Sequence, residues 1–349
     1  MLAYVIRRIF IGVIMLLVMS LVTFVLFFAS PVDPAQFACG KNCSPELREQ
    51  ARKSLGYPPH QAGVWESNIK GPVVMWADFT KGIVAGRDFP ADEAARKAAP
   101  EQVVHCAAPC LGYSTYSVKT VNSMVSAAFP VTFSIALAAV ILWVLFGVLI
   151  GVLAAVTKGS FVDRGIVGAS LFAYAFPSFF IGTFLLRYIA IKFGWVSVPA
   201  YSPIADGGPL KWGVNLMLPA ITLALLYMAS YVRMTRAFVL ESLTEDYVRT
   251  ARAKGVTQRV VLFKHALRAA LTPLVTMIGL DFAGVLGGAI ITESIFNFNG
   301  LGKLAVSASN NYDLPVLIGI VLVAGAFVIL ANIIVDILYA FIDPRVRVG

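Results

Sequence analysis

Three carboxylates, Asp281, Glu293 and Asp336, lie inside or at the edge of long apolar stretches of this sequence. Ionisable residues in such stretches are costly and commonly mark substrate paths or proton relays. One interpretation is a proton relay through Asp281 and Asp336. The favoured one is that each acid has a partner on another helix or faces a wet cavity. Asp281 is the first candidate for a translocation path, and Glu293 is expected to extend outward toward water.

The cysteines form a second group with chemical potential, arranged as two C-x3-C pairs: Cys39, Cys43, Cys106 and Cys110. An even number of cysteines confined to one segment outside the apolar stretches favours disulfides. The alternative is a metal site completed by His60 or His105, but zinc pairs are usually spaced C-x2-C. We predict disulfides and no metal. All three pairings stay open, and a bridge between the two pairs would close a loop of about 65 residues.

Catalytic motifs are absent from the sequence. It has three histidines, and it contains neither HExxH nor GxSxG. The phosphate-binding pattern GxxxxGK[ST] is missing as well. We therefore expect a protein that is not an enzyme and that binds no cofactor of its own.

The elements that carry these residues are membrane helices. Of the 349 residues, 58% are hydrophobic and 13% are charged, whereas a soluble domain carries about 25% charged residues. A spanning helix needs about 20 apolar residues. Six stretches qualify: Ile9–Ser30, Phe133–Val156, Gly165–Ile191, Leu216–Val239, Leu274–Ile295 and Leu314–Ile342. The sequence predicts an all-α integral membrane protein with six transmembrane helices, the first a retained helix rather than a cleaved signal.

The basic residues indicate the orientation. Lys and Arg concentrate in short segments that share one side if the N-terminus is cytoplasmic, which places both termini inside. This pattern explains the net charge of +9 without nucleic acid. We predict a cytoplasmic stub with the first helix at 1–30, an external subdomain at 31–132, and a core of five helices at 133–349.

A basic cytoplasmic loop, about 241–273, has the signals of a short helix. Thr244 is a plausible N-cap, and Asp246 would then lie in the first turn, where a carboxylate suits the helix dipole. Gly255 is the expected stop at the C-terminal end.

The same loop predicts a second short helix, capped by Thr257 and running toward Pro273. Tyr247, Val248 and Ala251 give the first helix an apolar edge with small side chains. A charged loop alone needs no such helix, so a packing contact with a cytoplasmic partner is the better explanation.

Several motifs resemble one family. RTARAKG, at 249–255, resembles the EAA-type loop of binding-protein-dependent ABC importer permeases, and the fuller string DYVRTARAKG…HALRAALTP is similar to the dipeptide/oligopeptide branch. That branch is also resembled by LGYPPH, GVLIGVLAA, FPSFFIG, GVLGGAIITESIF, NGLG and DPRVR. Two positions depart from the pattern: Arg249 stands where the name-giving Glu is found, and Asn299 stands where a Pro is common.

The resemblance implies a type I ABC importer permease fold in a bacterial inner membrane. The chain would form half of the translocation path of an ATP-driven importer of di- or oligopeptides, beside a second homologous permease. Two cytoplasmic ATPases, which bind ATP and Mg, and an external solute-binding protein would complete it. The ATPase-docking residues would be Asp246, Tyr247, Arg249, Ala251, Arg252, Ala253 and Gly255. Alternatives are a permease for nickel chelates or glutathione, a proton-coupled secondary transporter, or a membrane-anchored sensor.

Overall fold

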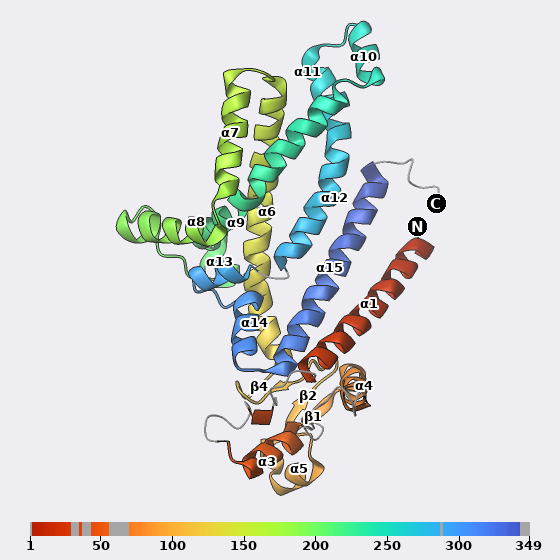
Figure 1. Ribbon diagram of the computed structural model, residues 1–349, viewed down its shortest axis with the longest axis vertical. Coiled ribbons are helices and arrows are strands. Elements are labelled where there is room, and N and C mark those ends of the chain that lie inside the picture. The colour runs from red at the N-terminus through yellow and green to blue at the C-terminus, as the bar shows by residue number, and fades with distance from the viewer. Residues whose placement is uncertain (1, 29–34, 37–42, 56–69, 287–288, 343–349) are drawn as a thin grey trace. The chain divides into compact units, whose positions relative to one another are not determined.

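The structure, a computed structural model, describes residues 2–28, 35–36, 43–55, 70–286 and 289–342, and long helices dominate it (Figure 1). Among the described residues, five helices are long and apolar enough to cross a membrane. They are Ile6–Leu26, Val121–Val156, Ile204–Ser242, Gln258–Val285 and Leu314–Val335. A sixth span results if the bent pair Phe161–Ala175 and Ser178–Lys192 is counted as one.

The elements before the second span are one long helix, α1, which carries the first span, and several short helices and strands. They are helices α1 (Leu2–Phe28), α3 (Pro45–Leu55), α4 (Lys70–Ala85) and α5 (Glu93–Ala98), the 3-10 turn Pro100–Gln102, and strands β1 (Arg87–Phe89), β2 (Val104–Cys106), β3 (Tyr113–Ser114) and β4 (Lys119–Thr120). Strand β1 pairs antiparallel with β2, and β3 pairs antiparallel with β4.

The remaining elements are helical. They are α6 (Val121–Val156), α7 (Phe161–Ala175), α8 (Ser178–Phe184), the π-helix Leu185–Lys192, α9 (Ile204–Ser242), α10 (Asp246–Ala253), α11 (Gln258–Val260), the π-helix Val261–Ala266, α12 (Leu267–Leu286), α13 (Ile290–Ile295), α14 (Leu301–Asn310) and α15 (Leu314–Ile342).

The chain divides into two compact units, of which the first comprises Met1–Pro130 and Lys303–Ala326. Its apolar core joins α1, α4 and the start of α15 through Phe24, Phe79, Leu314 and Ile318. The indole N–H of Trp76 donates to the Ser20 hydroxyl at 2.8 Å, which fixes α4 against α1. Core packing and this hydrogen bond together hold α4 to the helices that carry the first and the last candidate spans.

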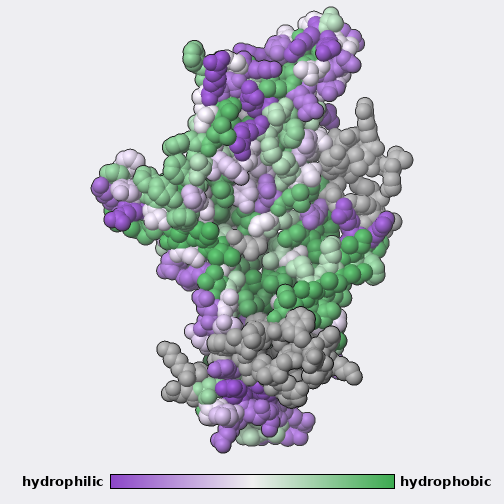
Figure 2. Space-filling model, in the orientation of Figure 1, coloured by the Kyte–Doolittle hydropathy of each residue, from purple (hydrophilic) through white to green (hydrophobic). Residues whose placement is uncertain are grey.

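The second unit comprises Val131–Gly302 and Phe327–Gly349. Trp143 of α6 is fully buried and stacks on Tyr227 of α9, with ring centroids 4.5 Å apart. Gly147 and Gly151 allow this approach, because a Cβ atom there would lie 2.8 Å from the Tyr231 Cβ and 2.7 Å from the Val232 carbonyl oxygen, respectively. Hydrophilic side chains of this unit gather over α10 and α11 (Figure 2).

Two spans differ from the sequence expectation. The third bends by 94° between α7 and α8. The bend follows from Pro177, since the residue before a proline avoids the α region, and Phe176 is extended at φ −89° and ψ 130°. In the fifth, α12 ends at Leu286, and a separate helix, α13, carries Glu293.

Candidate docking loop and membrane-embedded acids

Helix α10 ends in a Schellman motif. Gly255 has a φ of +77°, a left-handed conformation that favours glycine. Its N–H donates to the Arg252 carbonyl at 2.9 Å, and the N–H of Val256 donates to the Ala251 carbonyl at 3.2 Å. These are the two hydrogen bonds of the motif, so α10 ends at Gly255, as the sequence predicts.

A small apolar cluster anchors α10 to its own chain. Val248 is fully buried and Ala251 is 8% exposed, and both pack with Val261 of the helix that follows. Leu243 and Val256, from the turns on either side, pack against the same cluster. Both connecting turns are thereby held, and α10 has a fixed position between α9 and the helical run that begins at α11.

The opposite face of α10 is exposed and polar. Asp246, Arg249 and Ala253 point away from the cluster, and Tyr247 is 45% exposed. The ion pair between Arg249 and Asp246, at 3.7 Å, joins two exposed side chains and contributes little stability. Partial burial raises the pKa of Tyr247, and Glu245 adds to the rise. The surface that remains for a partner is polar, with one aromatic ring at its edge.

Three details of the loop correct the sequence expectation. The N-cap of α10 is Glu245, whereas the Thr244 hydroxyl donates back to the Glu241 carbonyl at 2.7 Å and so serves the end of α9. Ala251 faces the inner cluster and not the outer face. The helix that starts after Thr257 does not stop near Pro273, which lies inside α12. It continues as a candidate span over Gln258–Val285.

A charged clamp near the end of α9 was missed from the sequence. Arg236 donates from Nε and from a terminal nitrogen to the two carboxylate oxygens of Asp163, at 2.6 and 2.8 Å. The Gly159 N–H donates to the same carboxylate at 2.9 Å, and Ser160 caps α7. Because Arg-carboxylate pairs of this kind are strong and directional, the clamp fixes the start of α7 on α9. An Asp in a first helical turn and an Arg within an apolar stretch were the signals available.

Asp281 has a partner within the bundle. The Tyr231 hydroxyl of α9 donates to its carboxylate at 2.7 Å, and Tyr231 is fully buried beside Trp143. This is the interhelical arrangement favoured for the embedded acids. Asp336 lies on α15, and its side chain lies outside the described residues.

Glu293 is fully buried, so the expectation that it extends outward is wrong. The Thr132 hydroxyl of α6 donates to its carboxylate at 2.6 Å, and the Leu301 N–H donates to the Thr132 oxygen at 2.8 Å. The Phe298 N–H donates to the Glu293 carbonyl at 2.8 Å. Gly300 lies so close that a Cβ there would meet the carboxyl carbon at 2.4 Å. The acid thus organises the turn between α13 and α14.

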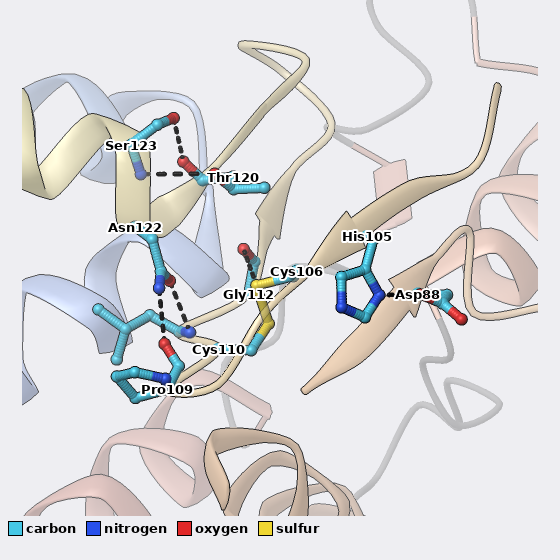
Figure 3. The surroundings of a disulfide bond; sticks show 10 residues. Asp88, His105, Cys106, Pro109, Cys110, Gly112, Thr120, Asn122 and Ser123 are labelled. Atoms are coloured by element: carbon cyan, nitrogen blue, oxygen red, sulfur yellow. Dashed lines mark hydrogen bonds and ion pairs between the residues drawn. A yellow bond between two sulfur atoms is a disulfide. The ribbon is translucent and has the colours of Figure 1, made fainter. Parts of the chain in front are cut away.

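Two of the four cysteines are joined within the second C-x3-C pair, since Cys106 and Cys110 form a disulfide (Figure 3). This excludes a bridge from either of them to the first pair. Cys43 is also disulfide-bonded, while Cys39 and His60 lie outside the described residues. His105 faces the Asp88 carboxylate at 2.6 Å and points away from the sulfur atoms (Figure 3). In the described part of the chain, no group of three or more potential ligands comes together around a metal position.

Comparisons with known proteins cover nearly the whole chain. Residues 147–348 match the family described as binding-protein-dependent transport system inner membrane component, and residues 1–136 match the N-terminal family of the same systems. A probable peptide ABC transporter permease of Sinorhizobium fredii is 32% identical over 99% of both chains. An oligopeptide transport system permease of Bacillus subtilis is 32% identical over 99% of this chain and 100% of its own. A glutathione transport system permease of Shigella flexneri is 33% identical over 99% of both.

Proposed function

The chain belongs to the binding-protein-dependent transport system inner membrane component family, and we propose that it forms half of the translocation path of an ATP-driven importer of di- and oligopeptides. As a member of that family it is a non-catalytic, multi-pass inner-membrane permease subunit, and such systems work with a binding protein and an ATPase. The other half of the path is a second homologous permease. ATP and Mg bind to two cytoplasmic ATPase subunits.

The substrate class is proposed from the names of the relatives. Several of the similar proteins are described as peptide, oligopeptide or di/tripeptide permeases, at 32–33% identity along their full length. Glutathione, named for one relative, is itself a small peptide. A peptide backbone is therefore the chemistry that these cargoes share. A competition assay distinguishes peptide uptake from uptake of nickel chelates, the other alternative for the solute.

The main support for a coupling role is that α10 has one buried face and one exposed face. Val248 and Ala251 fix the helix to its own chain, whereas Asp246, Arg249 and Ala253 stay exposed on the other face. A loop that only followed the usual concentration of Lys and Arg on the cytoplasmic side would need no such anchor. We propose that the exposed face seats in a cleft of an ATPase, with Tyr247, Arg252 and Gly255 at its margin. Closure of the ATPases would then displace α9 and α12 through α10.

This assignment fixes the orientation. With α10 in the cytoplasm, both termini are cytoplasmic and the 31–132 segment is external. The disulfide between Cys106 and Cys110 supports that side, since disulfides persist outside the reducing cytoplasm. Asp281 is proposed to belong to the wall of the path, held by Tyr231, and not to relay protons.

The test is a charge introduced on the outer face of α10. Ala253→Glu places a carboxylate in the proposed contact, and we expect a loss of more than about tenfold in ATPase co-purification and peptide uptake, because an unpaired charge in a contact is costly. The matched control is Ala94→Glu, the same change at an exposed alanine of α5. Equal uptake and assembly in both variants would refute the docking role.

A second experiment separates ATP drive from ion drive. Cells depleted of ATP with the proton gradient intact are expected to stop uptake, and collapse of the gradient at constant ATP is expected to leave it. The reverse pattern would favour a secondary transporter.

A further inference from the structure

The carboxylate of Asp281 has no cation beside it within the described part of the chain. The Tyr231 hydroxyl donates to one of its oxygens at 2.7 Å, and the described residues form no other hydrogen bond to this side chain. Their ion pairs all use other acids. Asp281 is only half-buried and lies within the candidate span Gln258–Val285. Because a charge at membrane depth is costly and commonly functional, a cation supplied from outside the chain would stabilise this carboxylate.

Aromatic rings gather at the same place. Tyr227 and Tyr231 are four residues apart on α9 and therefore share one face of that helix. Their ring centroids lie 4.5 and 6.2 Å from that of Trp143 on α6. Tyr227 is half-buried, so part of its ring remains uncovered. Since the faces of aromatic rings attract cations as a carboxylate does, this surrounding favours a cation that carries apolar groups over a fully hydrated ion.

Open space lies beside the carboxylate. Gly284 follows Asp281 by three residues on α12, so the two positions are neighbours on one face of the helix. Gly284 is exposed, and a Cβ there would meet no atom of the described residues within 4 Å. Gly279 differs, because a Cβ at that position would meet the side chain of Val335 on α15. One side of α12 is thus packed, and the side with Gly284 leaves room for a ligand next to Asp281.

The chemistry of this place fits an ammonium group better than a metal ion. A metal ion takes several oxygen ligands, and no group of three or more potential ligands comes together among the residues that the structure describes. An ammonium group has three N–H donors and a positive charge, which suit one carboxylate oxygen and an aromatic ring. Every unmodified peptide has such a group at its N-terminus, whatever its side chains. One fixed carboxylate therefore serves peptides of different sequence.

We propose that Asp281 binds the N-terminal ammonium group of a peptide during its passage across the membrane. The Tyr231 hydroxyl holds one carboxylate oxygen, and the other oxygen accepts a hydrogen bond from the ammonium group. The Tyr227 ring adds an aromatic surface, and the start of the peptide lies over Gly284. The identity of the ligand rests on the proposed function, peptide import. The contact is a weak one, because a half-buried carboxylate keeps part of its hydration, and the peptide can leave again.

The test uses the full-length chain, assembled with its partner permease and ATPases in nanodiscs without the binding protein. The probe is a tripeptide with a photoactivatable side chain, prepared with a free and with an acetylated N-terminus. The free amine is expected to label the chain around Tyr227 and Asp281 about tenfold more, since a hydrogen bond to a charged group has about that worth. Asp281→Asn keeps an acceptor for Tyr231 and is expected to remove this difference. Asp206→Asn, the same change at an exposed acid of α9, is expected to leave it.

A second variant covers the case that Asp281→Asn does not fold. Gly284→Leu leaves the carboxylate intact and fills the space beside it, so labelling by the free amine is expected to fall to the level of the acetylated probe. Equal labelling of the wild type by both probes, or unchanged labelling in Asp281→Asn or Gly284→Leu, would overturn the proposal. Loss of the second permease from the purified Asp281→Asn complex would overturn it too, because the carboxylate would then bind a cation of that partner.

Uptake by the same complex, with the binding protein added, separates this inference from the proposed function. Uptake of the unmodified tripeptide is expected to fall about tenfold in Asp281→Asn, the factor expected for the labelling. Peptide uptake that Asp281→Asn leaves unchanged would refute the ammonium site and leave peptide import standing. A wild type that imports no peptide, yet shows Asp281-dependent labelling by the amine probe, would refute peptide import and leave the site standing.

Discussion

Thr132 gives the sharpest test of the buried network around Glu293. Its hydroxyl donates to the Glu293 carboxylate at 2.6 Å and accepts the Leu301 N–H at 2.8 Å. Thr132→Val keeps the shape of the side chain and removes both hydrogen bonds. The side chains of Thr132 and Glu293 are fully buried and Leu301 is 2% exposed, so water cannot replace the lost partner without repacking.

The expected cost follows from these two bonds. An amide N–H left without an acceptor costs about 1 to 3 kcal/mol, and a hydrogen bond to a charged group is worth a similar amount. Thr132→Val should therefore lower the free energy of unfolding by about 2 to 5 kcal/mol. Thr132→Ser loses one methyl group and keeps both bonds, so its cost should be about 1 kcal/mol.

The assay is denaturant unfolding of the full-length chain in mixed micelles, followed by tryptophan fluorescence. A double-mutant cycle with Glu293→Gln should give a coupling energy of about 0.5 to 3 kcal/mol, because the two side chains share one network. Equal stabilities of Thr132→Val and Thr132→Ser, with no coupling to position 293, would refute the reasoning.

Two further predictions concern single residues outside the bundle. Gly255→Ala should destabilise the end of α10 by about 1 to 2 kcal/mol, since a left-handed φ penalises a Cβ. It should also lower the stimulation of the ATPase by the binding protein. The control is Gly159→Ala, at a φ of +80° in another turn and likewise in open space, which should cost the same stability without that functional loss. Burial raises the pKa of Asp313, against a smaller opposite effect of the hydrogen bond from Ser114. The folded state therefore holds this proton more tightly than the unfolded chain. Its ionisation costs stability as the pH rises from about 3.9, the ordinary value for Asp, through the raised folded value. Asp313→Asn should remove that loss, so unfolding free energies of wild type and variant should diverge as pH rises; parallel curves would contradict the assignment.

The long apolar runs of the sequence predicted the spans, because burial in lipid demands about 20 apolar residues whatever the neighbours are. The bend in the third span was missed although Pro177 was visible, since a proline inside a spanning helix is often tolerated by its surroundings. The position of Pro273 inside α12 is an example of such tolerance.

The structure of the loop could be predicted at the positions where local interactions determine the backbone conformation. Gly255 ends α10 because a left-handed residue is needed there, and that is a property of one position. Thr244 was misassigned as the cap because it can bond either forward to α10 or backward to α9, and only the tertiary packing chooses. Thr132 and Glu293, 161 residues apart in the chain, could not be paired from local patterns at all.

The short linkers on both sides of α10 have a mechanical consequence. Three residues separate α9 from α10, four separate α10 from α11, and apolar side chains from both linkers pack into the α10 cluster. Because the linkers are short and packed, a displacement of α10 would be transmitted to α9 and to the helical run that begins at α11. α9 runs for 39 residues and carries α6 with it through the glycine contacts at 147 and 151. A displacement of α10 would therefore rotate at least three long helices together.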